Sequence, residues 1–255
     1  MVVIAGIDLA WSGRKPTGVC VIRAEAGVVR LEQLCCIGGT AEDVAELLLS
    51  MGDDVVAGID APLIVGPARR AESELARAYG SRGVFAYAAR MDFLERHGIV
   101  EGPALGARLA ERGWSLSPGE LAQGAIGRYA LEVFPHATIV SLLGAEFALK
   151  YKKGSRAKRL GPLVAFQGLL RAYAERELPC LLTEAAAGIL TEPVELLTVR
   201  ALKNLEDRFD AIACAIAAYH AWKIGAAGLE VFGDDANGYI AVPRPVTSFP
   251  APSSP

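Results

Sequence analysis

Four aspartates have the residue type and the surroundings that a metal site needs. Asp8 and Asp60 each end an apolar run with the character of a buried strand, and Asp207 and Asp210 open an apolar helical stretch far along the chain. Carboxylate oxygens are the ligands that Mg²⁺ prefers, and two-metal hydrolysis of a phosphodiester needs acids from several elements. We therefore predict a catalytic Mg²⁺ or Mn²⁺ site with Asp8, Asp60 and Asp210 as ligands and Asp207 assisting.

Each of these acids also has an ordinary structural explanation. Asp8 and Asp60 could be turn residues, because aspartate often ends a strand by bonding the backbone that follows. Asn204 could cap a helix whose first turn contains Asp207, and acids in a first turn also suit the helix dipole. Asp210 lies one turn deeper, on a side that continues with small apolar residues, where an unpaired carboxylate costs several kcal/mol. Asp210 is therefore the stronger ligand candidate of the pair.

Two further residues near the predicted acids could take part in chemistry. Glu132 lies inside the apolar segment 129–134, where an acid is otherwise unfavourable, and we predict it as a fifth acidic member of the catalytic group. The alternative is an edge-strand charge that prevents aggregation. His136 follows Pro135 at a predicted helix start and could carry a proton or donate to substrate, although a structural histidine is the simpler interpretation.

A basic segment covers residues 150–159 in a chain that is acidic as a whole. Lys152, Lys153 and Arg156 could hold the phosphates of a substrate beside the acidic centre, since nucleic-acid binding relies on cations at the backbone. A solvated loop is the alternative. No P-loop motif and no signature of a serine or cysteine nucleophile occurs in the sequence.

Composition indicates a globular chain. It has 255 residues, 52% of them hydrophobic, and a net charge of -3, which argues against strong nonspecific binding to a polyanion. The five cysteines lack metal-finger spacing and indicate reduced core thiols. No apolar stretch is long enough to span a bilayer and no signal peptide is evident, so we expect a cytoplasmic protein that acts on a nucleic acid or nucleotide, away from membranes. The sequence is compatible with a homodimer as well as with a monomer.

The elements that must position the acids are predicted from hydrophobic periodicity. Residues 2–8, 18–23 and 28–34 form three antiparallel strands, and a helix over 41–51, capped by Thr40, leads to a fourth strand ending at Asp60. A helical crossover makes that strand parallel to the first. These elements place Asp8 and Asp60 at the same edge of one sheet.

The remaining chain is predicted to be one domain over residues 1–242 with a helical insertion at about 62–127. Charged helical stretches fill that insertion, at 69–79, 85–97 and 103–112. A strand over 129–134, helices over 162–177 and 205–224, and a short hairpin around Asn237-Gly238 follow. Residues 243–255 are rich in Pro and Ser and are predicted to form a disordered tail.

The sequence resembles a known family in four blocks that occur in order. They are Gly6-Ile7-Asp8-Leu9-Ala10-Trp11, Ile59-Asp60-Ala61-Pro62-Leu63, Glu132-Val133-Phe134-Pro135-His136-Ala137 and Asp207-Arg208-Phe209-Asp210-Ala211. Together they look like the predicted RNase H-like nucleases, a domain family of unknown function. The resemblance implies a ribonuclease H-like α/β fold, with a mixed sheet of three antiparallel and two parallel strands flanked by helices.

The closing block is also similar, more distantly, to that of the Holliday-junction resolvases of the same superfamily. Their metal ligands lie on strand one, strand four and the C-terminal helix. The resemblance implies Asp8, Asp60, Asp207 and Asp210 as the corresponding positions, whereas Glu132 has no counterpart. The acidic balance and the helical insertion depart from the resolvase pattern.

Three functions are compatible with the sequence. The first is a Mg²⁺- or Mn²⁺-dependent phosphodiesterase, a nuclease, that uses the acids as described. The second is a nucleotide-binding or phosphoryl-transfer protein, because a strand that ends in Asp8 and a glycine-containing hairpin also resemble the first phosphate loop of the actin and sugar-kinase superfamily. The third is a non-catalytic adaptor whose acids hold no metal and whose insertion is a partner surface.

Overall fold

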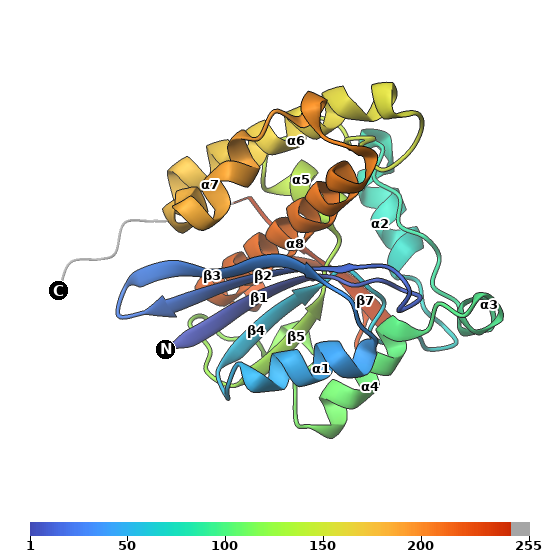
Figure 1. Ribbon diagram of the computed structural model, residues 1–255. Coiled ribbons are helices and arrows are strands. Elements are labelled where there is room, and N and C mark those ends of the chain that lie inside the picture. Colours follow the sequence, from blue (N-terminus) through green and yellow to red (C-terminus); the bar gives the residue numbers. More distant parts are fainter. Residues whose placement is uncertain (246–255) are drawn as a thin grey trace.

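A mixed five-stranded sheet forms the centre of the protein, and the computed structural model describes it within residues 1–245, the side chains of 184–187 excepted (Figure 1). Its strands are β1 (Val2–Asp8), β2 (Thr17–Glu25), β3 (Val28–Ile37), β4 (Val55–Ile59) and β5 (Arg128–Glu132). The order is β3-β2-β1-β4-β5, with β1, β2 and β3 antiparallel and β4 and β5 parallel to β1. This confirms the predicted sheet, whose topology is compatible with a ribonuclease H-like fold.

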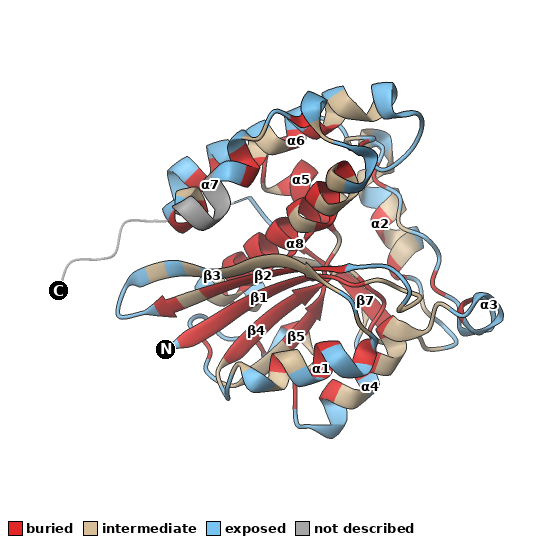
Figure 2. Cartoon of the chain, in the orientation of Figure 1, coloured by how far each residue is buried: buried red, intermediate tan, exposed pale blue. Residues whose placement is uncertain are grey.

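Helices cover both faces of the sheet (Figure 1). One face carries α5 (Pro135–Ser141), α6 (Arg156–Glu177), α7 (Glu184–Thr191) and α8 (Val199–Ile224), and the other carries α1 (Ala41–Ser50) and α4 (Glu101–Glu111). Strand β1 alternates between the two cores, with Ile4 packed on the α8 side and Ile7 on the α1 side. Because both faces are covered, every residue of the strand is buried (Figure 2), which agrees with a sequence that is apolar up to Asp8.

Glycines let α8 lie unusually close to the sheet. A Cβ atom added to Gly6 would lie 2.0 Å from the carbonyl oxygen of Ala211, and one added to Gly18 would lie 2.1 Å from that of Asp207. Gly18 pairs with Asp8 across the β1–β2 ladder. The close approach therefore brings the acidic turns of α8 beside the carboxyl end of β1.

Helix α8 begins earlier than predicted. Its N-cap is Thr198, whose side-chain oxygen accepts a hydrogen bond from the Ala201 amide at 3.2 Å. The interpretation of Asn204 as a cap is therefore wrong, because Asn204 already lies inside the helix. Asp207 has no first-turn amides to cap, so its acidic side chain needs another explanation.

The segment between β4 and β5 contains α2 (Ala71–Tyr79), α3 (Met91–His97) and α4. Residues 84–90, predicted in part as helix, are not helical. Gly83 ends the preceding turn in a left-handed conformation with φ +79°, and the chain then follows an irregular path. This path brings aromatic side chains to the site described below.

Helix α6 also begins earlier than predicted, at Arg156 rather than near Pro162. The C-terminal part of the basic segment is thus helical, and the rest precedes the helix. Short 3₁₀ turns occupy Gly80–Arg82, Pro118–Glu120, Pro179–Leu182, Val194–Leu196 and Ala226–Gly228.

A second, two-stranded sheet closes the described chain. It consists of β6 (Leu229–Asp234) and β7 (Gly238–Pro243), which confirms the predicted hairpin. Pro243, the first residue of the predicted tail, ends β7, and residues 246–255 of that prediction lie outside the described residues. Within residues 1–245 no helix is long and apolar enough to cross a membrane.

Candidate functional site

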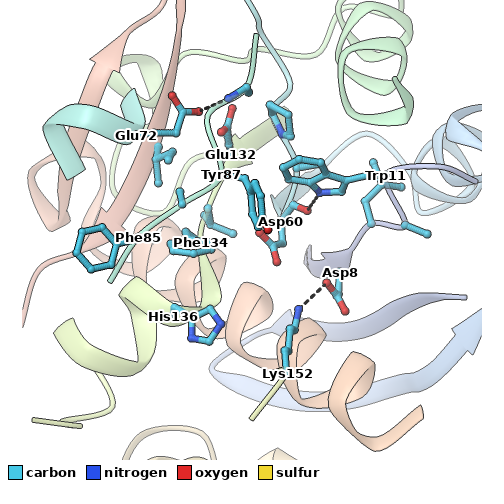
Figure 3. A pocket seen from close by; sticks show the side chains of 18 of the residues that line it. Asp8, Trp11, Asp60, Glu72, Phe85, Tyr87, Glu132, Phe134, His136 and Lys152 are labelled. Atoms are coloured by element: carbon cyan, nitrogen blue, oxygen red, sulfur yellow. Dashed lines mark hydrogen bonds and ion pairs between the residues drawn. The ribbon is translucent and has the colours of Figure 1, made fainter. Parts of the chain in front are cut away.

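A pocket of about 590 Å³ opens where β1 and β4 end, and acids from separate elements reach it (Figure 3). Asp8 comes from the tip of β1, Asp60 directly follows β4, and Asp207 comes from α8, and all three line the pocket. Asp210 is fully buried one turn further along α8. The structure therefore brings the four predicted aspartates to one region.

Lys152 is the direct partner of two of these aspartates. Its Nζ lies 2.6 Å from Oδ2 of Asp210 and 3.6 Å from Oδ1 of Asp8 (Figure 3). The Lys152 side chain is 32% exposed, whereas the Asp210 side chain that it binds is fully buried. Burial by itself lowers the pKa of Lys152, but Asp210, Asp8 and Asp60 together raise it well above its usual range. Lys152 therefore supplies a permanent positive charge.

Burial and mutual repulsion raise the pKa values of Asp8 and Asp60. Burial raises the pKa of Asp8 well above its usual range, Asp210 and Asp60 add to that effect, and Lys152 opposes it. Burial likewise raises the pKa of Asp60 to about 7, with Lys152 lowering it and Asp210 raising it. Buried carboxylates that repel one another are a common feature of functional sites.

Tyr151 and His136 form an aromatic wall beside Asp210. The Tyr151 hydroxyl donates a hydrogen bond of 2.5 Å to Oδ1 of Asp210, and the His136 ring stacks on Tyr151 with centroids 4.9 Å apart. Burial lowers the pKa of His136 to about 4, and its Nδ1 has no hydrogen-bond partner among the described residues. His136 is thus a neutral imidazole at the pocket wall at neutral pH.

Asp207 is held by its own helix. Lys203, one turn earlier on α8, pairs with Oδ1 of Asp207. The second carboxylate oxygen, Oδ2, is buried and has no hydrogen-bond partner in the part of the chain that the structure describes. An unpaired buried carboxylate oxygen is costly and is a candidate ligand atom.

Glu132 has a different environment from the aspartates. Arg69 binds it with two hydrogen bonds, of 2.5 and 3.1 Å, and the Leu63 amide donates a third of 3.1 Å. Arg69 is 3% exposed, and it also contacts Glu72 on α2 at 2.8 Å. Glu132 lines the pocket, but its acceptors are used in holding residues 62–72 against β5. The geometry therefore indicates a structural ion pair at the predicted catalytic position.

The basic residues predicted to bind substrate separate into two groups. Lys152 and Lys153 line the pocket, and the ammonium of Lys153 lies 5.4 Å from the centre of the Tyr87 ring. Arg156 is not brought to the pocket, because its guanidinium donates hydrogen bonds to the carbonyl oxygens of Glu195 and Leu197.

The predicted metal ligands do not form a ready coordination sphere. Within residues 1–245, and leaving aside the side chains of 184–187, no three His, Cys, Asp or Glu residues are grouped closely enough to hold a metal ion. The physical reason lies in the cations already present, since Lys152 reaches both Asp8 and Asp210 and Lys203 binds Asp207. The donor set suits Mg²⁺ or Mn²⁺ by chemistry, and a metal would need Lys152 to move aside.

Sequence reasoning missed several residues of the site. Tyr151 and Arg69 are partners of the acids, and Trp11, Phe85 and Tyr87 line the pocket. Tyr151 has a local signal, because it is an aromatic residue inside a basic segment. Arg69 has none, because nothing in the sequence near it indicates a contact with Glu132, 63 residues away.

Comparison with known proteins gives one family. The model of a family described as a protein of unknown function, DUF429, matches residues 6–237, which include every acid of the site. No curated protein and no solved structure matches the chain significantly. Since the match covers most of the sequence, this chain is a member of the DUF429 family.

Proposed function

We propose that the protein is a Mg²⁺- or Mn²⁺-dependent phosphodiester hydrolase, a nuclease of the ribonuclease H-like superfamily. The observation that carries this proposal is the convergence of Asp8 from β1, Asp60 from the end of β4 and Asp207 from α8 on one pocket, with Asp210 buried beside them and paired with Lys152. The mixed sheet with three antiparallel and two parallel strands supports the superfamily assignment.

Each residue of the site has a role in this proposal. Asp8, Asp60 and Asp210 hold the cation, with Oδ2 of Asp207 as a further oxygen donor. A divalent ion bound there supplies neutralisation of phosphate charge and lowers the pKa of water. Lys152 and Lys153 bind the phosphate of the substrate, and Tyr151 fixes the orientation of the Asp210 carboxylate.

Lys152 has two consequences for this proposal. Without a metal, the Lys152 ammonium offsets the repulsion among the acids. A cation held by the same acids would leave that ammonium free to contact a phosphate of the substrate.

A direct assay tests the proposal. The purified chain is incubated with single-stranded, duplex and branched DNA or RNA in Mn²⁺ or Mg²⁺, and in EDTA. We expect cleavage with metal only, and its loss in Asp8→Asn and Asp210→Asn. The same metals should raise the Tm of the native chain and not of the double variant.

A second candidate is a non-catalytic adaptor with the same fold. The observation that favours it is the Lys152 ammonium, which satisfies Asp8 and Asp210 without a metal. No Tm shift at millimolar metal, together with no cleavage of any substrate, selects this candidate over the hydrolase.

A further inference from the structure

Aromatic side chains surround the acidic centre, and two of them are exposed to an unusual degree. Phe85 is 64% exposed and Tyr87 is 69% exposed, and both lie on the non-helical segment 84–90. Trp11 and Phe134 line the same pocket, and Figure 3 shows Tyr87, Phe134 and Trp11 beside Asp60, with Phe85 farther along the pocket wall. Large exposed aromatic rings cost free energy in water, so a group of them beside a charged site indicates a ligand with a flat apolar face.

The rings are held in place by specific contacts. The Trp11 indole Nε1 donates a hydrogen bond of 3.3 Å to the backbone carbonyl of Asp60, which ties this ring to the end of β4. Lys153 lies over the Tyr87 ring, in a cation–π contact. A stacking surface and a cation thus occur together at the pocket mouth.

The charges of the pocket favour an anionic group beside that surface. Arg69, Lys152 and Lys203 pair with acids of the site. Lys15, Lys150 and Lys153 also line the pocket, and none of them forms an ion pair with the side chains that the structure describes, which leave out those of 184–187. Cations without an acidic partner can bind the phosphate of a nucleotide, and aromatic rings beside them can stack on its base.

We infer that this pocket binds a nucleotide whose base is unpaired, with the base stacked on Tyr87, Phe85 as a further aromatic part of the pocket wall, and the phosphate held by Lys150 and Lys153. A volume of about 590 Å³ lies in the range of small-ligand pockets, roughly 300–1,000 Å³, and suits one nucleotide. In a duplex both faces of a base are covered, so a paired strand cannot offer this ligand. This inference rests on the proposed function in one respect: the proposed hydrolase places the phosphate that is cleaved beside the aspartates of the same pocket.

The test measures binding in EDTA, where no metal-dependent cleavage occurs. Fluorescence anisotropy compares a labelled single strand with a duplex of the same sequence, and an unlabelled mononucleotide competes with the single strand. We expect the single strand to bind at least about tenfold more tightly than the duplex. If the mononucleotide competes at a concentration close to the Kd of the single strand, the ligand is a small nucleotide. If it fails to compete, the ligand is a single-stranded nucleic acid.

Variants assign the binding to the rings. Tyr87→Ala and Phe85→Ala should each weaken single-strand binding roughly tenfold, and Tyr87→Phe should retain it. Phe147→Ala is the matched control, because Phe147 is 55% exposed and does not line the pocket. Equal affinity for single strand and duplex, or unchanged affinity in Tyr87→Ala, overturns the inference.

These outcomes separate the two proposals. Selective single-strand binding without cleavage in Mn²⁺ retains the nucleotide site and removes the hydrolase. Metal-dependent cleavage that is insensitive to Tyr87→Ala and Phe85→Ala retains the hydrolase and removes the stacking site.

Discussion

Lys152 places a fixed positive charge between the carboxylates of Asp8 and Asp210. These acids raise its pKa well above its usual range, so it stays charged at neutral pH. A divalent cation would satisfy the same carboxylates. Lys152 and a metal therefore compete for one position, and this competition can be measured.

Lys152→Met should destabilise the metal-free protein by about 2 kcal/mol, because the acids lose their counter-charge and the site is partly open to solvent. The variant should also bind Mn²⁺ more tightly than the native chain. Thermal unfolding in EDTA and isothermal titration with Mn²⁺ provide the two readings. Lys158→Met, at an exposed position outside the pocket, should change neither. Unchanged metal affinity in Lys152→Met would refute the competition.

Asp60 should make the stability of the metal-free protein depend on pH. Its pKa is about 7 in the folded chain, against 3.8 for the free residue. Between these values the unfolded chain has released a proton that the folded chain retains, so the Asp60 contribution is complete below about pH 4 and is lost as pH rises through about 7. Relative to Asp60→Asn, the native Tm in EDTA should therefore fall by several degrees between about pH 5 and pH 8. A constant difference across this range would show that Asp60 titrates normally.

Among the elements, α8 contributes most to the position of the acids. Its backbone lies directly on Gly6 and Gly18, and its N-cap is Thr198, so Asp207 and Asp210 are set deep in a regular helix. The i, i+3 spacing of these acids predicts that they share a side. The glycines decide how close that side comes to β1.

Gly6→Ala should lower the free energy of unfolding by about 3 kcal/mol or more, because the added Cβ meets the backbone of α8, which cannot move without shifting the helix. Urea denaturation measures the change. Gly168→Ala is the matched control: Gly168 lies within α6 with nothing within 4 Å of an added Cβ, so it should raise stability by up to about 1 kcal/mol. Equal effects of the two changes would contradict the close approach.

At the scale of the whole molecule, Arg69 connects the segment between β4 and β5 to the sheet. It binds Glu132 at the end of β5, Glu72 on α2 and the carbonyl oxygen of Ile64. The connection sets one wall of the pocket. It also explains Glu132 without catalysis.

Arg69→Met should destabilise the protein by about 3–5 kcal/mol, because it leaves two carboxylates without their partner. Adding Glu132→Gln should recover part of the loss. Urea denaturation gives the free energies, and hydrogen exchange should show lost protection in α2. If Glu132→Gln abolished cleavage and left stability unchanged, Glu132 would be catalytic after all.

The sequence by itself determined the sheet and the acids at its edge. Apolar runs that end in aspartate, and the spacing of Asp207 and Asp210, are local features whose meaning does not depend on distant residues. The predictions that were wrong concern features that do depend on distant residues. The starts of α6 and α8 and the non-helical path of residues 84–90 depend on caps and packing that hydrophobic periodicity does not encode.

Only the tertiary structure decided the partners. Lys152 at the aspartates, Arg69 at Glu132 and Arg156 turned away from the pocket are contacts between segments remote in the chain. Each depends on where long, flexible side chains end once the elements have packed, and charge pairing carries no sequence period. Local residue types therefore fixed which groups are available, and packing chose which of them meet.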